Sequence, residues 1–89
     1  MIIKLFGGLR QIAGGAEINE TGTTIREVLQ KVCAKNEILG DALFSEGVAE
    51  LRPHVRVMVN GVDSELFEGL DTAVDEDDQI AIFPPLAGG

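Results

Sequence analysis

The chain has 89 residues, enough for one domain, and carries 15 acidic against 7 basic side chains, a formal net charge of −8 at pH 7. This charge repels nucleic-acid phosphates, so it excludes nucleic-acid binding and makes a basic protein surface the expected partner. One cysteine and one histidine exclude an internal disulfide and cannot assemble a zinc or iron–sulfur site, so no metal is expected.

The hydropathy pattern predicts a chain that neither spans a membrane nor is exported. No apolar run reaches the roughly 18 residues of a membrane helix, and the N-terminus lacks the charged head and apolar core of a signal peptide. We therefore expect a cytoplasmic location, with no membrane partner.

The first predicted element is a strand over residues 1–6, whose Phe6 lies on the face opposite to the core-facing Ile3 and Leu5. Two glycine pairs then bracket residues 7–15, which we predict to be a loop. No Gly-Lys-Ser/Thr sequence follows it, so it is not a phosphate-binding loop.

A short strand at residues 16–19 leads into the main helix. Thr24 and Glu27 have the spacing of a capping box at its start, and the helix is expected to end near Lys35. Apolar residues recur three and four positions apart and give this helix one apolar face, formed by Ile25, Val28, Leu29, Val32 and Cys33. On this face Cys33 is expected to be a buried, unreactive thiol.

A second short helix is predicted over residues 38–44. Its inward-facing residues would be Ile38, Leu39, Ala42 and Leu43. The following residues, 45–53, form a looser stretch whose conformation the sequence leaves open.

Residues 54–59 form the clearest strand, with three valines on one face and Met58 on the other. His54, at its start, is expected to be a solvated polar residue without a catalytic partner. Asn60-Gly61 is the dipeptide preferred in a two-residue type I′ hairpin, and it predicts a returning strand over residues 62–67.

Four consecutive acids at residues 75–78 precede the last strand. Because such a run resists burial, a solvated turn is favoured over a docking patch for a basic partner. The last strand, residues 79–83, directs Ile80 and Ile82 to the core and Phe83 to the opposite face.

This element order predicts an α+β fold of the β-grasp type, a mixed sheet of about five strands wrapped on one main helix with a short second helix. A ferredoxin-like sandwich has a compatible order, but the single strong helix favours the β-grasp. Residues 1–83 would form the domain and residues 84–89 a projecting tail. Phe6, Met58 and Phe83 would be apolar groups on the outer sheet face, either covered by loops or used to dock a partner.

The tail Phe83-Pro84-Pro85-Leu86-Ala87-Gly88-Gly89 combines a stiff root with a slim tip. The two prolines fix φ, whereas two residues without side chains can enter a slot too narrow for any Cβ. The Gly89 carboxylate is ionised at neutral pH and must be activated, for example as a mixed anhydride with AMP, before it can transfer its acyl group. An incidental Gly-Gly end is the alternative.

Ile82 to Gly89 resembles the C-terminal signature of the small subunit of molybdopterin synthase, a ubiquitin-like sulfur carrier. Ile3-Lys4-Leu5-Phe6 and Leu9-Arg10-Gln11-Ile12-Ala13-Gly14 resemble the first strand and following loop of that family. The short second helix favours this type over the shorter thiamine-type carrier. The resemblance implies that Gly89 is the reacting group. The expected partner-binding residues are Phe6, Met58, Phe83, Pro84, Pro85, Leu86, Ala87 and Gly88.

The resemblance also implies a reaction sequence in which the chain is not catalytic alone and binds no cofactor. An ATP-dependent adenylating enzyme would use ATP and Mg to adenylate Gly89, and a persulfide sulfur donor would convert the product to a thiocarboxylate. The large subunit of molybdopterin synthase would then pass the sulfur to cyclic pyranopterin monophosphate. The chain contributes presentation and positioning of its tail.

Other uses of the same tail remain open. A ubiquitin-like modifier would join Gly89 to lysines of target proteins, and a carrier in the thiamine, cysteine or tRNA pathways would deliver sulfur elsewhere. A third reading, a non-covalent β-grasp interaction module, requires that deletion of Gly88 and Gly89 leave function unchanged.

Overall fold

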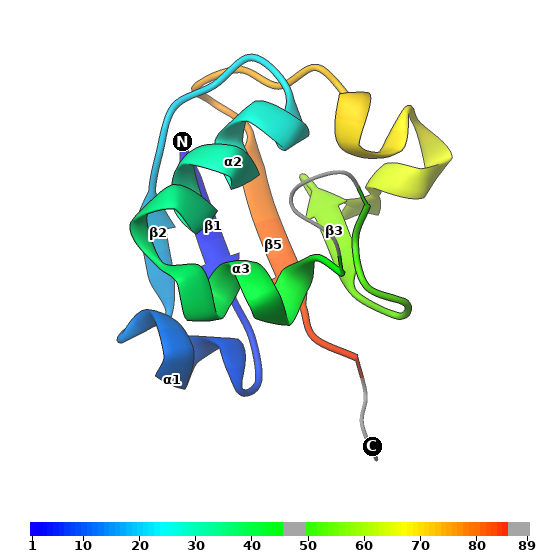
Figure 1. The fold of residues 1–89 in the computed structure, drawn as a ribbon. Coiled ribbons are helices and arrows are strands. Elements are labelled where there is room, and N and C mark those ends of the chain that lie inside the picture. Colours follow the sequence, from blue (N-terminus) through cyan, green and yellow to red (C-terminus); the bar gives the residue numbers. More distant parts are fainter. Residues whose placement is uncertain (46–49, 86–89) are drawn as a thin grey trace.

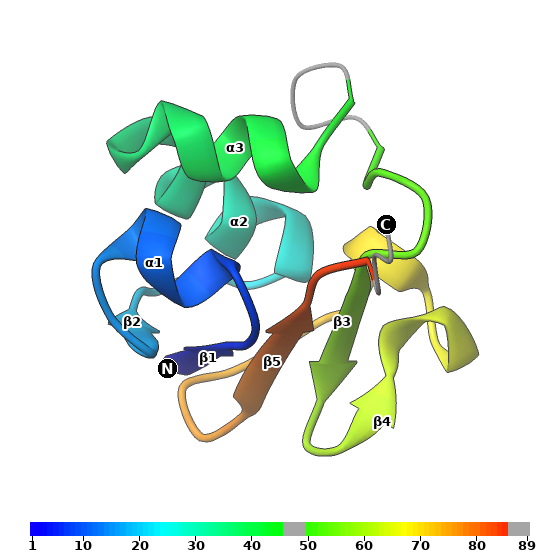
Figure 2. The same ribbon diagram turned by 90° about the horizontal axis from the view of Figure 1, so that it is seen from below.

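The structure is a computed structural model that describes residues 1–45 and 50–85. Within these residues one mixed sheet has the strand order β2-β1-β5-β3-β4, and three α-helices cover one of its faces (Figures 1 and 2). The strands are β1 (Ile2–Leu5), β2 (Glu17–Asn19), β3 (Arg56–Val59), β4 (Val62–Asp63) and β5 (Gln79–Phe83). The helices are α1 (Leu9–Ala13), α2 (Ile25–Lys35) and α3 (Glu37–Leu43).

The central strand β5 lies between β1 and β3. It pairs in parallel with β1, where Ile3 is opposite Ile80, and antiparallel with β3, where Val57 is opposite Ile82. These side chains face α2 and are fully or almost fully buried. A mixed sheet wrapped on one main helix is the predicted β-grasp arrangement, which is confirmed.

The core lies between the sheet and α2 with α3 beside it. Burial of these apolar side chains is the main favourable contribution to folding. The buried members are Met1, Ile3, Leu5, Leu9, Ile25, Val28, Leu29, Val32, Leu39, Leu43, Phe44, Val55, Val57, Val59, Val74, Ile80 and Ile82.

The start of α2 has the predicted cap. The Glu27 amide donates to Thr24 Oγ1 at 3.1 Å, and the Glu27 carboxylate accepts from the Thr23 amide at 3.0 Å, one residue earlier than in the standard capping box. A second cap joins the helices, because Asn36 Oδ1 accepts from the Leu39 amide at 3.1 Å while Asn36 Nδ2 donates to the Ile12 carbonyl at 3.1 Å.

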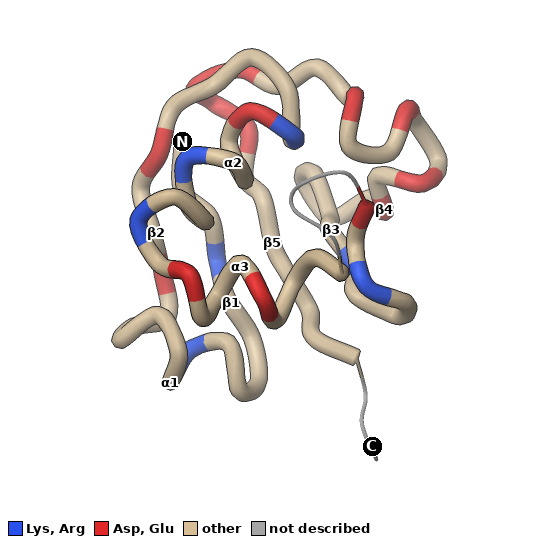
Figure 3. The backbone as a smooth tube through the Cα atoms, viewed as in Figure 1, with Lys and Arg blue, Asp and Glu red and all other residues tan. Residues whose placement is uncertain are grey.

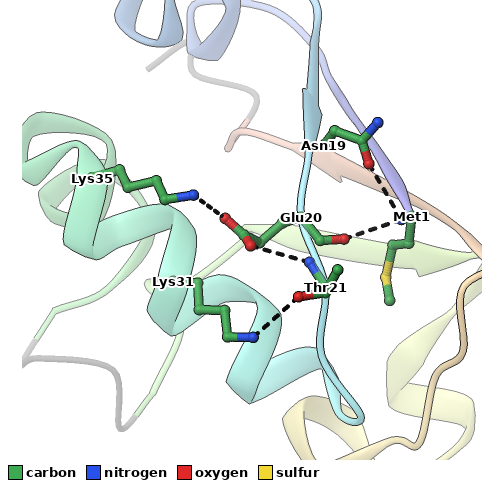
Figure 4. A network of polar contacts seen from close by, with 6 residues as sticks. All are labelled: Met1, Asn19, Glu20, Thr21, Lys31 and Lys35. Carbon is green, nitrogen blue, oxygen red and sulfur yellow. Dashed lines mark hydrogen bonds and ion pairs between the residues drawn. The ribbon is translucent and has the colours of Figure 1, made fainter.

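A polar network fastens the first strand to α2 (Figure 4). The Met1 ammonium donates to the Glu20 carbonyl at 3.0 Å, and the Glu20 carboxylate accepts from Lys35 at 2.7 Å. The hydrogen bond from Lys35 and then that from the Thr21 amide hold the pKa of Glu20 below its usual range. Lys31 completes the network by donating to Thr21 Oγ1 at 3.2 Å.

Two predicted elements are wrong. The predicted loop after β1 contains the helix α1, which ends where Gly14 adopts a left-handed φ of 78°. The predicted strand over residues 62–67 stops at Asp63, whose carboxylate accepts from the Glu65 amide at 2.9 Å and turns the chain into two 3₁₀ helices, Ser64–Leu66 and Gly69–Asp71. Side-chain capping by aspartate therefore outweighs the strand pattern here.

Smaller corrections concern α3 and β3. Leu39 and Leu43 of α3 are fully buried as predicted, but Ile38 is 68% exposed, so its inward orientation was wrong. Strand β3 begins at Arg56 instead of His54, because His54 has a φ of 70°, which breaks an extended chain. The predicted turn residue Asn60 has the positive φ that a type I′ hairpin requires.

Among residues 1–45 and 50–85, no helix has the length and apolar character needed to cross a membrane. The same residues contain no group of three or more His, Cys, Asp or Glu side chains placed to hold a metal ion.

Candidate functional site

Two phenylalanines stack at the point where the tail leaves the sheet. Their ring centroids are 4.3 Å apart and their planes differ by 11°. The parallel pairing of β1 and β5 brings them together, since the Phe6 amide donates to the Ile82 carbonyl at 3.2 Å, just beyond β1. Phe83 is 37% exposed, so the described residues do not cover the pair completely, and its predicted place on the outer face is confirmed.

An open cavity of about 580 Å³ adjoins this aromatic pair. Because its walls are mainly apolar, it is a candidate site for an apolar group, and it lies at the root of the tail. Its lining residues are Phe6, Gly7, His54, Arg56, Phe83 and Pro84.

Gly7 lets the tail root approach the chain closely. Its φ is +58°, and a Cβ built on it would lie 2.8 Å from Pro84 Cγ, closer than side-chain carbons pack. Position 7 therefore requires glycine for two reasons, backbone conformation and space. The sequence indicated a turn glycine here but not its contact with the tail, because Pro84 meets it only through tertiary structure.

Basic side chains lie at or near the cavity although the whole chain is acidic. Arg56 lies opposite Phe83 in the strand register, and its Nη1 is 2.9 Å from Asp63 Oδ2. Arg10 places Cζ 5.4 Å from the centroid of the Phe6 ring, while its Nε donates to the Leu5 carbonyl at 2.9 Å. The exposed His54 lines the cavity together with Arg56. Sequence reasoning did not assign any of these three residues to the site.

The predicted partner-binding residue Met58 is on the expected face but does not line the cavity. It is half-buried, opposite Ala81 and Asp63, whereas Arg56 occupies the row opposite Phe83. A two-residue repeat thus places arginine, and not methionine, beside the aromatic pair.

The rest of the predicted tail is described only in part. Pro84 and Pro85 are half-buried at the root. Leu86, Ala87, Gly88 and Gly89 lie outside the described residues. The partner contacts of these residues, and the reaction at Gly89, remain predictions.

Cys33 lies away from this site. It is half-buried on α2, which covers the inner face of the sheet, whereas the aromatic pair lies on the outer face. A Cβ built on Gly40 would lie 3.2 Å from Cys33 Cβ, so α2 and α3 pack closely there. Burial raises the pKa of the Cys33 thiol, which disfavours the nucleophilic thiolate.

Solved structures share this architecture over nearly the full chain. The solution structure of small archaeal modifier protein 1 from Methanosarcina acetivorans is 32% identical and covers 99% of this chain and 94% of that one, with a TM-score of 0.89. A chain of the Amycolatopsis orientalis BexX/CysO complex is 27% identical and covers 99% of this chain and 98% of that one, with a TM-score of 0.86.

Curated relatives have similar lengths. Small archaeal modifier protein 3 of Haloferax volcanii is 32% identical over 98% of this chain and 96% of its own length. A putative sulfur carrier protein of Archaeoglobus fulgidus is 33% identical over 85% of both chains. The model of the ThiS family matches residues 3–89. Because this match spans almost the whole sequence, the chain belongs to the ThiS family, whose relatives here include small protein modifiers and a putative sulfur carrier.

Proposed function

We propose that this chain is a ubiquitin-like modifier that is joined to lysines of target proteins through Gly89. The observation that carries the proposal is the stacked Phe6–Phe83 pair, with its open apolar cavity, at the root of a tail that ends in Gly88-Gly89. Two relatives named as small archaeal modifier proteins, matched over almost their whole lengths, support it.

The proposed chemistry begins at the Gly89 carboxylate. One of its oxygens attacks the α-phosphorus of ATP on an adenylating enzyme that binds ATP and Mg, and pyrophosphate leaves. A target lysine amine then attacks the carbonyl of the acyl adenylate, so that an isopeptide bond forms, AMP leaves and the amine loses a proton. The chain's own groups dock the partner and position the tail.

A second candidate function uses the same adenylate for sulfur transfer. The terminal sulfur of a persulfide displaces AMP and forms an acyl disulfide. A second thiol then reduces this bond, which leaves a thiocarboxylate at Gly89 and a disulfide on the donor. The relative named as a putative sulfur carrier favours keeping this candidate.

Sulfur delivery to molybdopterin is one form of this second candidate, with the large subunit of molybdopterin synthase as the partner. The helix α3 does not favour it over the modifier function. The solved modifier structure covers 99% of this chain, so its match extends over the α3 region as well. The acceptor of the activated tail therefore has to be determined by experiment.

The test uses the full-length chain with an N-terminal tag, incubated with ATP, Mg and an extract of its own cells. Digestion after acidic residues releases the tail as the peptide Gln79–Gly89, because Asp78 is the last acid of the chain. The proposal predicts this peptide on lysines of other proteins, located by mass spectrometry. The matched control lacks Gly88 and Gly89 and should form no adduct.

Intact mass in the same reaction distinguishes the two candidates. Replacement of one oxygen by sulfur at Gly89, with Cys33 blocked separately by alkylation, supports the carrier. If a folded chain yields neither a lysine adduct nor a thiocarboxylate, tail activation is wrong and the non-covalent interaction module replaces it.

A further inference from the structure

A second exposed apolar surface lies away from the tail. Leu66 is 76% exposed, Phe67 is 53% exposed and Val62 is 39% exposed, and all three come from β4 and the turn that follows it. We call them the Phe67 surface. Apolar side chains that gather in one exposed segment are typical of a contact site for another molecule.

An open cavity of about 360 Å³ lies beside Phe67. Its described lining combines apolar groups, Val59, Phe67 and Ala73, with the buried Thr72 and two carboxylates, Glu68 and Asp78. An aromatic ring next to carboxylates is chemically suited to a cation carried on an aliphatic stem, because the ring face and the carboxylates both attract positive charge.

The Phe67 surface and the aromatic pair at the tail root lie toward opposite ends of β5. In the register of β3 and β5, Val59 is opposite Ile80 near the start of β5, whereas Arg56 is opposite Phe83 at its end. Figure 1 shows the same separation, since the segment before β5 crosses one end of the sheet and the tail leaves at the other. A partner on the Phe67 surface would leave the tail accessible.

The charge around this cavity is negative. Figure 3 shows acidic positions concentrated along the segments between β4 and β5. The Asp78 carboxylate accepts from Asn60 Nδ2 at 2.8 Å and from the Asp75 amide at 2.8 Å, and these two bonds lower the pKa of Asp78 and keep it ionised. Within the described part of the chain, the ion pairs include neither Glu68 nor Asp78. Arg26 is engaged with Asp71 at 3.2 Å.

We propose that the Phe67 surface docks a basic segment of a partner protein, with a lysine or arginine stem against Phe67 and its charge toward Glu68 and Asp78. Charge complementarity selects this occupant. A nucleic acid would be repelled, and so would a second copy of the chain presenting the same acidic surface. The inference is independent of tail activation, because it involves neither Gly88 nor Gly89.

The experiment titrates the isotopically labelled full chain with the capped peptide Leu-Lys-Leu-Lys and follows backbone amide shifts by NMR. Saturable shifts are expected at Phe67, Glu68, Ala73 and Asp78. The capped peptide Leu-Glu-Leu-Glu should cause none. A chain without Gly88 and Gly89 should bind the basic peptide equally well, which separates this result from any failure of the proposed function.

Two matched pairs of variants distinguish docking from general attraction to an acidic protein. Glu68→Gln should raise the Kd about two- to fivefold, while Glu76→Gln, the same charge change outside the cavity, leaves it unchanged. Phe67→Ser should raise the Kd about fivefold and Ile38→Ser, at another exposed apolar residue, should not. Equal effects within each pair, or shifts spread over all acidic segments, would overturn the proposal. Because Glu68 is exposed, its variant tests docking without risk to folding.

Discussion

At the scale of single residues, Gly7 provides the sharpest test of the tail root. Gly7→Ala forces a Cβ to within 2.8 Å of Pro84 Cγ at a φ of +58°. Gly14→Ala is the matched control, because Gly14 also has a positive φ, of +78°, but no atom within 4 Å of the new Cβ. Gly14→Ala should lower the free energy of unfolding by about 1 kcal/mol, and Gly7→Ala by about 1–2 kcal/mol more.

Chemical denaturation monitored by circular dichroism measures both values. Equal losses at the two positions would mean that Pro84 moves away at no cost, and that Gly7 does not fix the direction of the tail.

The residues of the candidate site differ in how far sequence could predict them. Phe6 and Phe83 follow from strand alternation, which is local. The roles of Gly7, Arg56 and His54 depend on which strands become neighbours, and on the positive φ of His54, which a strand pattern does not encode. Met58 was assigned to the site because alternation identifies a face but not a position along it.

At the scale of elements, predictions succeeded where the signal was local and strong. The helix α2 has a cap and an apolar stripe within its own sequence, and both are present. The helix α1 is short and flanked by glycines, so its apolar pattern was too brief to outweigh the turn signals. The prediction of a returning strand over residues 62–67 failed because the Asp63 side chain caps the turn that follows.

The acidic turn before β5 provides a prediction about pH. Asp78 accepts from the Asn60 amide group and the Asp75 amide, and these bonds lower its pKa below the ordinary value of 3.8. Between the folded and unfolded pKa values the unfolded chain binds a proton that the folded chain does not. The contribution of Asp78 to stability is therefore complete above its ordinary pKa and lost as pH falls through its folded pKa.

Asp78→Asn should thus reduce the fall in the free energy of unfolding that occurs as the pH is lowered. Denaturant unfolding at a series of pH values, from neutral to below the ordinary pKa, measures this fall. Glu76→Gln removes one acid from the same turn but keeps the hydrogen bond between Asp78 and Asn60. Its free energy of unfolding should therefore fall more steeply with decreasing pH than that of Asp78→Asn. Identical curves for the two variants would count against the Asn60 bond as the cause.

At the scale of the whole molecule, two exposed aromatic residues belong to two surfaces with different charged neighbours. The cavity beside Phe83 is lined by His54 and by Arg56, which pairs with Asp63, whereas the cavity beside Phe67 is lined by Glu68 and Asp78. The net charge of −8 predicted a basic partner, but it did not show that basic side chains lie at the tail root and carboxylates beside Phe67. The net charge could not reveal this separation, because it says nothing about where the charged side chains lie in the structure.

Replacement of each phenylalanine by alanine should show that the two surfaces have different roles. Phe83→Ala should reduce the yield of Gly89 adducts in cell extract about tenfold, because it removes an aromatic anchor, while the loss of stacking lowers the free energy of unfolding by only about 1 kcal/mol. Phe67→Ala, which also removes an exposed ring, should leave the yield unchanged. A similar loss of adducts in both variants would show that the tail-root site is not specific.

The position of β5 between β1 and β3 has a consequence for protein synthesis. A ribosome makes β1 and β3 before β5, so neither half of the aromatic pair has its neighbour until the last strand has been inserted. A released but misfolded chain would therefore not present the proposed docking site, even with its glycines accessible. Under the proposed function, tail activation would then be confined to molecules that have finished folding, a form of quality control that needs no additional protein.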